Sequence, residues 1–410
     1  MTVRSLVNGF PDCPPPGWQR LPFWAVARRK KSTGWPDEEL LSVYLGRGVI
    51  RHSEASDYTH APSEDLSSYQ LVDPGDAVFN NQQAFRGCVG VSTFRGITSP
   101  AYLVYSFSSE VLPAYASYLL TDPLMVGQYG QVSRGVGTIQ RQVSPDELRK
   151  VSLVLPPLTA QRTIAEHLAT ETDRIDSLIE KKRRMVDYLI ERRRAVIHGK
   201  LEGPESGSRG SSSKEGLETR LRFLLKERDQ RGNEGENVLS VYRDLGVIPK
   251  DSRTDNFNRT PEDLSGYKLV MPGDVVVNKM KAWQGSVAVS PYRGIVSGDY
   301  LVCEVIGQVE LRFLHYLLRS PRLIGEYGMR SSGIRPSQWR LYWDDFANIR
   351  VTLPATSTQI AVGDELDGAI RWGDELKSKL DEQIDLLREH RGTLITAAIT
   401  GRLSVPGVAA

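Results

Sequence analysis

The stretch Leu155–Leu201 reads LPPLTAQRTIAEHLATETDRIDSLIEKKRRMVDYLIERRRAVIHGKL. A related stretch starts at Leu353 with LPATSTQIAVGDEL and ends with LITAAITGRL at Leu403. Each begins with a strand-like apolar residue and a proline. Thr159 and Ser357 follow as predicted helix N-caps, because a hydroxyl oxygen there can accept a backbone N–H that is free in the first turn. The pattern predicts two long helices, over residues 157–201 and 355–403.

Apolar residues recur along both predicted helices at heptad spacing. Lys182, Arg192 and His390 also fall on these seams. Each seam needs a partner, and the other helix can supply it, so we predict an antiparallel or crossed coiled coil. The alternative is two separate helices, each buried on its own domain. The residues expected to pack are Ile164, Leu168, Ile175, Leu178, Met185 and Leu189 in the first helix and Val362, Leu366, Leu376, Leu380, Leu387 and Leu394 in the second.

Length and composition narrow the class of protein. A chain of 410 residues is too long for one core. Cys13, Cys88 and Cys303 lie far apart, which argues against a disulfide framework or a zinc site and suits a reducing compartment. The sequence shows neither a signal peptide nor eighteen consecutive apolar residues, so we expect a cytoplasmic protein that is not inserted in a membrane.

Charge is distributed unevenly although the net charge is only +2. A net charge close to zero argues weakly against a protein that binds polyanions through its overall charge. Basic residues nevertheless gather at Lys181–Arg184, at Arg192–Arg194 and at Ala27–Lys31. The alternative for the helical clusters is a solvated helix face.

The whole pattern occurs twice. LSVY starts at Leu41 and again 198 residues later at Leu239, and the same shift relates EDLSSY at Glu64 to EDLSGY at Glu262 and the two PGD motifs at Pro74 and Pro272. A register held over so many positions indicates duplication of a unit made of a domain and a helix. At the end of the helix the register breaks, because Gly199 and Gly401 differ by 202. This break predicts that the first helix lacks about four residues, one turn.

The repeat defines the expected domains. Short apolar runs broken by Gly, Pro, Asn and Asp are typical of strand-rich domains. Gly and Ser between the copies indicate a flexible linker. Such domains on paired helices predict an α+β molecule with pseudo-two-fold symmetry, and each helix is long enough to separate two half-sites on a duplex. The expected boundaries are 1–156 for the first domain, 157–201 for its helix, 202–216 for the linker, 217–354 for the second domain, 355–403 for its helix and 404–410 for a tail.

Motifs around the helices resemble one known family. LPPL-x-x-Q-x-x-I starts the first helix and LP-x-x-x-x-Q the second, after Ser133-Arg134-Gly135 with Gly137-Thr138-Ile139 and after Ser331-Ser332-Gly333-Ile334. PGDVVVNKMKAWQG at Pro272–Gly285 is similar to target-recognition domains. Over nearly its whole length the chain resembles the specificity (S) subunit of type I restriction-modification systems, the HsdS family. The first copy departs from the pattern, since it reads PGDAVFNNQQAFRG.

The resemblance implies a function and a set of partners. Each domain would recognise one part of a split, asymmetric sequence in double-stranded DNA, while the helices hold the spacing and dock two methyltransferase (M) subunits. Restriction (R) subunits could join the complex. The chain itself would need no cofactor, because S-adenosylmethionine, ATP and Mg²⁺ would be bound by the partner subunits.

Two loops in each copy carry side chains suited to DNA. Arg reads guanine and Asn or Gln reads adenine by paired hydrogen bonds, whereas Lys mostly contacts phosphates. The loop after each PGD motif and the loop before each helix are therefore the candidate DNA-binding segments. For Asn80 and Asn278 the alternative is a turn that satisfies its own backbone, for Trp283 a core position, and for the arginines surface decoration. The candidates are Asn80, Asn81, Gln82, Gln83, Arg86, Arg134 and Arg141 in the first copy and Asn278, Lys279, Lys281, Trp283, Gln284, Arg330, Arg335 and Gln338 in the second.

Catalytic motifs are missing from the sequence. An amino-methyltransferase would need an Asn/Asp-Pro-Pro-aromatic loop, whereas the proline runs here are CPPPGW and LPPL. The histidines lack a paired nucleophile or ligand spacing, and Pro145–Lys150 is better explained as a structural segment than as a nuclease motif. We expect a DNA-specificity subunit without catalytic or metal sites. The alternative is a coiled-coil scaffold for proteins, or a degenerate subunit whose shortened helix no longer supports activity.

Overall fold

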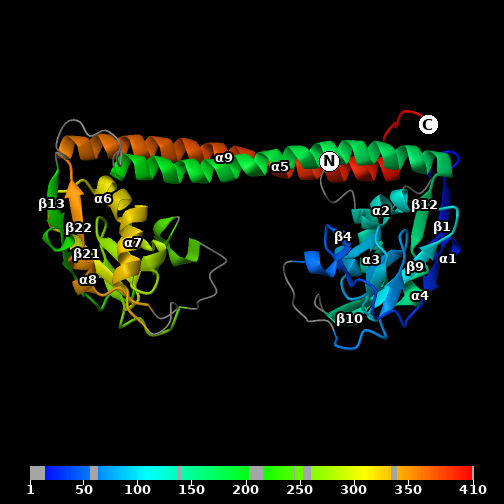
Figure 1. Cartoon of the computed structure of the whole chain (residues 1–410), viewed down its shortest axis with the longest axis horizontal. Coiled ribbons are helices and arrows are strands. Elements are labelled where there is room, and N and C mark those ends of the chain that lie inside the picture. Colours follow the sequence, from blue (N-terminus) through cyan, green and yellow to red (C-terminus); the bar gives the residue numbers. More distant parts are fainter. Residues whose placement is uncertain are drawn as a thin grey trace. The chain divides into compact units, whose positions relative to one another are not determined.

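The computed structural model describes residues 14–55, 63–136, 140–202, 216–243, 245–252, 260–333 and 339–408 (Figure 1). Cys13 and most of the predicted linker lie outside these residues. The chain forms two compact units. Unit 1 comprises Met1–Arg183 with Asp381–Ala410, and unit 2 comprises Arg184–Leu380. Each unit therefore holds one strand-rich domain, the start of one long helix and the end of the other.

Unit 1 is built on a four-stranded antiparallel sheet in the order β2-β9-β6-β7, beside the two-stranded pairs β1–β12, β3–β4, β5–β8 and β10–β11. Helix α2 lies against β7, and α3 lies against the short helix η3. The elements are β1 Gln19–Pro22, α1 Phe23–Val26, β2 Ala27–Lys30, β3 Leu41–Tyr44, β4 Gly48–Arg51, η2 His52–Glu54, β5 Gln70–Val72, β6 Ala77–Asn80, η3 Ala84–Arg86, β7 Val89–Val91, β8 Gly96–Thr98, β9 Tyr102–Phe107, α2 Pro113–Thr121, α3 Pro123–Val132, β10 Ser133–Val136, β11 Gln140–Val143, α4 Pro145–Leu148 and β12 Ser152–Leu155.

Unit 2 repeats this topology with the sheet β14-β21-β18-β19 and the pairs β13–β22, β15–β16 and β17–β20. Each of these strands starts 198 residues after its counterpart in unit 1, so the predicted duplication is confirmed. At the place of the β10–β11 hairpin, the described residues of unit 2 include the antiparallel bridge between Ser332 and Arg340. The elements are β13 Leu217–Arg220, η4 Leu221–Phe223, β14 Leu225–Glu227, β15 Leu239–Tyr242, β16 Gly246–Pro249, η5 Lys250–Ser252, β17 Lys268–Val270, β18 Val275–Asn278, η6 Ala282–Gln284, β19 Val287–Val289, β20 Gly294–Val296, β21 Tyr300–Val305, α6 Leu311–Leu318, α7 Pro321–Arg330, α8 Trp343–Ala347 and β22 Arg350–Leu353.

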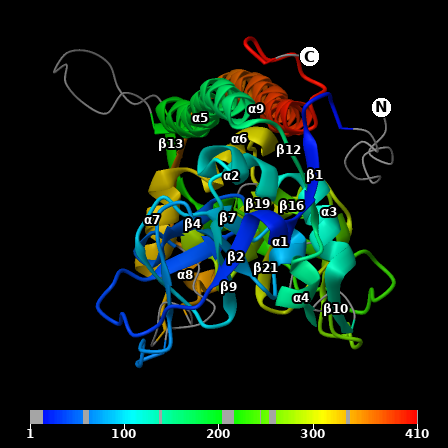
Figure 2. The same cartoon turned by 90° about the vertical axis from the view of Figure 1, so that its right-hand side faces the viewer.

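The long helices are α5, Leu158–Glu202, and α9, Thr356–Ile399, and they lie side by side in opposite directions (Figures 1 and 2). In unit 1 the guanidinium of Arg391 lies 3.2 Å from the carboxylate of Asp176, and Lys182 donates to Gln383 at 2.5 Å. In unit 2 Arg193 pairs with Asp374 at 3.1 Å, and Lys200 pairs with Glu365. As the α5 numbers rise the α9 numbers fall, so the predicted antiparallel packing is confirmed.

Both helices also pack on the domains. In unit 1 one core joins Phe79 and Tyr105 of the sheet to Ile164 and Leu168 of α5 and to Ile399 of α9. Thr396 of α9 donates to the buried carboxylate of Asp122 at 2.6 Å, which also accepts the Leu124 N–H at 2.8 Å. Burial raises the pKa of Asp122, although these hydrogen bonds oppose the rise. The C-terminal part of α9 is thus a component of the unit 1 core.

The contact positions along the helices differ from the predicted heptads. Leu178 and Met185 were expected to pack, but they are 40% and 50% exposed, and Ile179 and Val186 turn inward instead. Ile164 and Ile175 are buried and Val186 is half-buried, and these positions recur every 11 residues. A straight helix with 3.6 residues per turn drifts away from a heptad by about 20° per repeat, and an 11-residue spacing follows it more closely.

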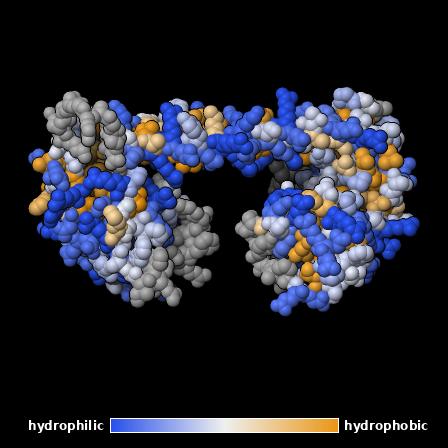
Figure 3. All heavy atoms as spheres, viewed as in Figure 1, coloured by the Kyte–Doolittle hydropathy of each residue, from blue (hydrophilic) through white to orange (hydrophobic). Residues whose placement is uncertain are grey.

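The same drift explains the polar residues on the predicted seams. Arg192 and His390 are exposed, whereas Arg193 and Arg391, one position later, are half-buried and make the ion pairs between the helices. The other predicted packing residues are not exposed: Leu189, Leu366 and Leu380 are buried like Ile164, Leu168 and Ile175, and Val362, Leu376, Leu387 and Leu394 are half-buried. Figure 3 shows hydrophobic side chains scattered among hydrophilic ones on the visible face of both helices.

A pair of alanine variants tests the displaced seam. Ile179→Ala is expected to cost about 2–4 kcal/mol of unfolding free energy, because it opens a cavity against Ile384. Leu178→Ala is expected to change stability by less than about 0.5 kcal/mol, because that side chain is exposed. Urea unfolding of the two variants measures both values. If Leu178→Ala loses more unfolding free energy than Ile179→Ala, the helices pack through the predicted heptad positions and the displaced seam is wrong.

The helix starts differ from the prediction. Thr159 and Ser357 are not N-caps, since they lie inside the first turns. The first backbone acceptors are the carbonyls of Pro157 and Ala355, which bond the N–H groups of Gln161 and Gln359 at 2.9 and 3.0 Å. Each helix therefore begins one residue before the hydroxyl residue.

The predicted missing turn is also wrong. Helix α5 has 45 residues and α9 has 44. Gly199 is inside α5, whereas Gly401 follows α9 with φ 70° and ends it in the left-handed conformation that favours glycine. The two glycines therefore occupy different structural positions, and their spacing does not report helix length.

A buried glutamine joins each helix start to its domain. Gln161 is 1% exposed. Its side chain accepts the Leu112 N–H at 2.8 Å and donates to the carbonyls of Glu110 and Pro156 at 2.8 and 2.9 Å. Gln359 makes two of these bonds, to the Glu310 N–H at 2.9 Å and the Pro354 carbonyl at 2.8 Å. The glutamine of each LP-x-x-x-x-Q motif is therefore a structural residue.

Candidate nucleic-acid interface

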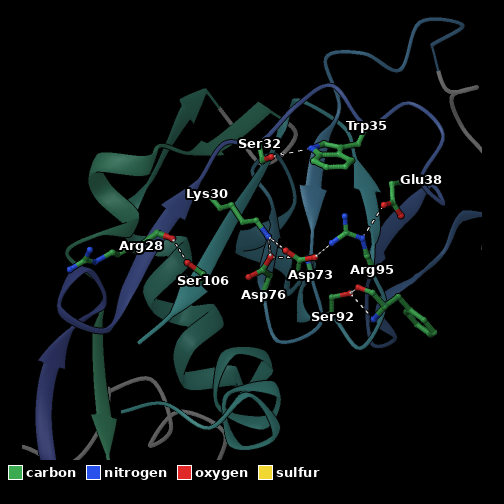
Figure 4. Close-up of polar contacts among 11 residues, drawn as sticks. Arg28, Lys30, Ser32, Trp35, Glu38, Asp73, Asp76, Ser92, Arg95 and Ser106 are labelled. Carbon is green, nitrogen blue, oxygen red and sulfur yellow. Dashed lines mark hydrogen bonds and ion pairs between the residues drawn. The ribbon is translucent and has the colours of Figure 1, made fainter. Parts of the chain in front are cut away.

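The turn before the first candidate loop is held by ion pairs. In unit 1 the Asp76 carboxylate accepts the Asp73 N–H at 2.8 Å, and Lys30 donates to Asp73 and Asp76 at 2.5 and 2.7 Å (Figure 4). Burial alone would lower the pKa of Lys30, but the hydrogen bonds and charges of these carboxylates raise it overall. In unit 2 Arg228 and Asp274 make the equivalent pair. Lys30 of the basic cluster at Ala27–Lys31 therefore supports the turn.

Each candidate loop then starts with an asparagine turn. The Asn80 side-chain oxygen accepts the Gln82 N–H at 3.2 Å, and that of Asn278 accepts the Met280 N–H at 3.1 Å. These are the local turns that asparagine favours. Each loop ends in a short helix, η3 or η6, followed by Gly87 or Gly285 with φ of 97° and 94°. Asn80 and Asn278 therefore stabilise the turns of their own loops through these hydrogen bonds.

Other loop side chains face outward. Gln82 and Arg86 are exposed in unit 1, and Lys281 and Gln284 are exposed in unit 2. The Arg86 guanidinium lies 5.3 Å from the ring centre of Phe85, a cation–π distance that limits its motion. These four residues have the groups and the exposure required for direct contact with base edges.

Half-buried polar residues lie beneath this exposed layer. Asn81 and Gln83 belong to unit 1 and Lys279 to unit 2. The side-chain oxygen of Asn81 is buried without a hydrogen-bond partner. Burial lowers the pKa of Lys279, and the charge of nearby Lys268 lowers it further. A bound ligand can donate a hydrogen bond to the Asn81 oxygen and can accept one from Lys279.

Trp283 supports the unit 2 loop. Its indole N–H donates to the Met280 carbonyl at 3.0 Å, and its ring meets Trp339 edge to face with centroids 5.7 Å apart. Both the polar group and one ring surface are therefore used within the protein. This arrangement favours the packing interpretation over base stacking.

A backbone hydrogen bond links the first candidate loop to the segment that contains or follows the second one. In unit 1 the Val143 N–H of the β10–β11 hairpin donates to the Asn81 carbonyl at 2.9 Å. In unit 2 the Leu341 N–H donates to the Lys279 carbonyl at 3.0 Å. In each unit a backbone hydrogen bond thus joins segments that lie about 60 residues apart in the sequence. Their approach could not be read from the motifs alone.

The arginines of the second loop are partly engaged. Arg134 is exposed and pairs with Glu147 at 2.7 Å, and Arg141 is half-buried on the facing strand. Arg330 ends α7 and pairs with Glu326 at 3.0 Å. Arg335 and Gln338 lie outside the described residues, as do Gly137–Ile139 and Ile334. Glu147 belongs to α4, where Ser144 caps the helix, so the acidic segment at Pro145–Lys150 has a structural role.

Sequence reasoning missed a buried lysine near the unit 2 loop. Lys268 of β17 is 4% exposed, and its ammonium lies 3.5 Å from Asp229 and 3.9 Å from Glu227. Hydrogen bonds from Arg231 and the charge of Lys268 lower the pKa of Asp229 to about 2. The equivalent residue in unit 1, Gln70, donates to the Tyr102 carbonyl at 2.8 Å. The sequence contained one signal for this site, because both copies have a polar residue, Gln70 or Lys268, at the same position of an apolar strand.

The described residues provide no candidate metal centre. They contain no group of three or more His, Cys, Asp or Glu side chains placed to hold a metal ion. Cys88 and Cys303 are buried thiols, and burial raises the pKa of both. In the described part of the chain, none of the helices has the length and apolarity needed to span a bilayer.

Comparison with known proteins gives structural matches only. No family model and no curated protein matches the chain. One match is a chain from a structure of complex assembly and conformational transition of the type I R-M system, with a TM-score of 0.70, 17% identity and coverage of 96% of this chain and all of that chain. Another is the HsdS subunit from Thermoanaerobacter tengcongensis, with a TM-score of 0.54, 17% identity and the same coverage. Along nearly its whole length, the chain therefore has the α+β fold of a type I restriction-modification specificity subunit.

Proposed function

We propose that the chain is the sequence-specific DNA recognition subunit of a type I restriction-modification complex, with each domain reading one half of a bipartite, asymmetric site. The observation that carries this proposal is the repeated framework, in which the loop after each PGD motif presents different exposed side chains. The exposed residues are Gln82 and Arg86 in one unit and Lys281 and Gln284 in the other. Equal frameworks with unequal exposed side chains suit two readers of different sequences.

The long helices would set the spacing of the half-sites and dock two M subunits, with R subunits joining the complex. Both α5 and α9 continue from one unit into the other, as a spacer requires. Catalysis, together with S-adenosylmethionine, ATP and Mg²⁺, would belong to the partners. The nearly equal lengths of α5 and α9, 45 and 44 residues, remove the shortened helix as a reason to regard the chain as a degenerate subunit.

Methylome sequencing of cells that express the chain with its cognate M subunit tests the recognition function. A bipartite modified motif is expected. Replacing Gly216–Leu353 with the matching segment of another specificity subunit should change one half of that motif only, because this segment contains the whole strand-rich part of unit 2. Absence of any motif would contradict the function, and a change in both halves would contradict the assignment of one domain to one half-site.

An exposed aromatic patch is the candidate docking surface for an M subunit in unit 2. Met185, Tyr188 and Arg192 follow one stripe of α5, and the Arg192 guanidinium lies 5.2 Å from the ring centre of Trp372 on α9. Tyr188 and Trp372 are 60% and 51% exposed. Tyrosine, tryptophan and arginine are the residue types that contribute most to protein interfaces.

Replacing both aromatic residues by alanine tests this patch. The variant Tyr188→Ala/Trp372→Ala is expected to weaken binding of the M subunit by about three orders of magnitude, since each such anchor contributes about 2 kcal/mol or more. Titration of labelled M subunit measures the dissociation constant. Arg371→Ala, at the exposed neighbouring residue, is the matched control. Equal affinity of the double variant and the wild type would place docking elsewhere.

A further inference from the structure

Unit 2 contains a concavity of about 400 Å³ lined mainly by arginines. Its lining residues are Arg220, Arg322, Glu326, Arg330, Asn348 and Arg350. Arg220 and Arg350 also border an adjoining hollow of about 290 Å³ beside Phe223. We call the larger concavity the arginine pocket. Four guanidinium groups in one hollow are an unusual arrangement for a surface without a ligand, because like charges repel.

Three elements bring these side chains together. Strands β13 and β22 place Arg220 directly opposite Arg350 in an antiparallel ladder, where two like charges destabilise the pair. Helix α7 contributes Arg322, Glu326 and Arg330 from successive turns. These α7 residues lie on the side away from Ile324, which packs toward Gly285 of the candidate recognition loop. The pocket is thus separate from that loop.

The lining of the pocket is itself mostly positive. It consists of four arginines, one glutamate and one asparagine. Arg330 pairs with Glu326 at 3.0 Å, and Arg350 pairs with Glu218 at 3.3 Å. Arg220 donates to the neutral side-chain amide of Asn348 at 3.3 Å, and Arg322 donates to the Arg350 carbonyl at 3.1 Å.

The duplication supplies an internal control for the role of these arginines. The unit 1 residues 198 positions before Arg220, Arg322, Arg330 and Arg350 are Pro22, Leu124, Val132 and Ser152. None of the four is charged, yet both units have the same topology. The shared framework therefore folds without an arginine at any of these positions. Folding alone does not account for the pocket.

We propose that the arginine pocket binds a phosphate group. Guanidinium presents a planar fork of donors that matches phosphate oxygens and forms strong, charge-assisted hydrogen bonds. The phosphate can belong to a small ligand or to a DNA backbone that passes beside the half-site read by unit 2. The DNA source rests on the proposed function, whereas the small-ligand source does not. Glu326 limits the affinity, because it competes with the anion for Arg330.

The first test measures pyrophosphate binding to the full chain by calorimetry. The variant Arg220→Gln/Arg350→Gln is expected to bind pyrophosphate about ten- to a hundredfold more weakly than wild type, since it removes charge-assisted hydrogen bonds. Glu326→Gln is expected to bind it more tightly. The control is Arg149→Gln/Lys150→Gln, which removes two exposed positive charges from the equivalent region of unit 1. Circular dichroism melting shows whether each variant is folded.

The second test measures duplex binding by the complex with its M subunits over a range of salt concentrations. If the phosphate is that of DNA, the slope of log affinity against log salt falls by about one in Arg220→Gln/Arg350→Gln, and the methylated motif is unchanged. If only pyrophosphate binding weakens, the ligand is a small phosphate. The proposal is overturned if neither measurement changes, or if the variant loses only M-subunit binding, which would make the pocket a protein contact. A wild-type complex that modifies no bipartite motif contradicts the proposed function but leaves the pyrophosphate test valid.

Discussion

Replacing Gln82 and Arg86 together by alanine is expected to lower modification of the cognate site by about two orders of magnitude or more. Each paired hydrogen bond to a base edge contributes about 1–3 kcal/mol of discrimination, and 1.4 kcal/mol corresponds to a factor of ten. Both side chains are exposed in the unit 1 loop whose Asn81 carbonyl accepts the Val143 N–H. The loss should be accompanied by relaxed specificity in one half of the motif, because only one domain is changed.

The measurement is the methylation rate of duplexes that carry each single substitution in both half-sites, using the complex with its M subunits. Lys281→Ala/Gln284→Ala provides a matched variant, because both residues are exposed in the corresponding loop of unit 2. The two double variants should relax opposite halves of the motif. If both affect the same half, or if neither alters specificity, these loops are not the readers. A smaller specificity effect is expected for Lys281→Ala/Gln284→Ala, since lysine mainly contacts phosphates.

Gln161→Leu is expected to be the most destabilising of the single substitutions considered. The change leaves the Leu112 N–H and the carbonyls of Glu110 and Pro156 without the partner that they have in the native protein. A buried polar group that loses its hydrogen bond costs about 1–3 kcal/mol, so a loss of about 3 kcal/mol or more is expected. Urea unfolding, followed by circular dichroism, measures the change in unfolding free energy.

Two further variants show whether this loss arises from the hydrogen bonds. Gln359→Leu removes two such bonds in unit 2 and should therefore cost less than Gln161→Leu. Arg162→Ala changes the exposed neighbour of Gln161 and should shift stability by less than about 0.5 kcal/mol. Equal stability of Gln161→Leu and Arg162→Ala would show that the buried glutamine does not anchor the helix.

Much of the fold could be predicted because the duplication places the same sequence motifs in both copies. PGD at Pro74 and Pro272 is a weak turn motif when it occurs once. Two occurrences in one register identify it as part of a framework, and the strands β6 and β18 do start three residues after each proline. The long helices were predictable for a different reason, since their apolar positions continue over many turns.

The orientation of single side chains and the contacts between loops depend on three-dimensional packing, which the residue types alone do not specify. The inward turn of Ile179 in place of Leu178 results from a small angular drift that accumulates along the helix. Asn80 shapes a turn through one hydrogen bond, whereas Gln82 two residues later is free to face outward, and both are polar amides in the same loop. The contact between Val143 and Asn81 joins segments with no common motif. Tertiary packing decides each of these cases.

The core of unit 1 is completed by residues from the end of α9, including Ile395 and Ile399. All of unit 2 lies between these residues and the rest of unit 1 in the sequence. On the ribosome, the first domain to be synthesised is consequently the last to be completed. Until α9 emerges, Ile175 and Ile179 of α5 lack Ile384, the α9 residue that packs against them in the complete protein.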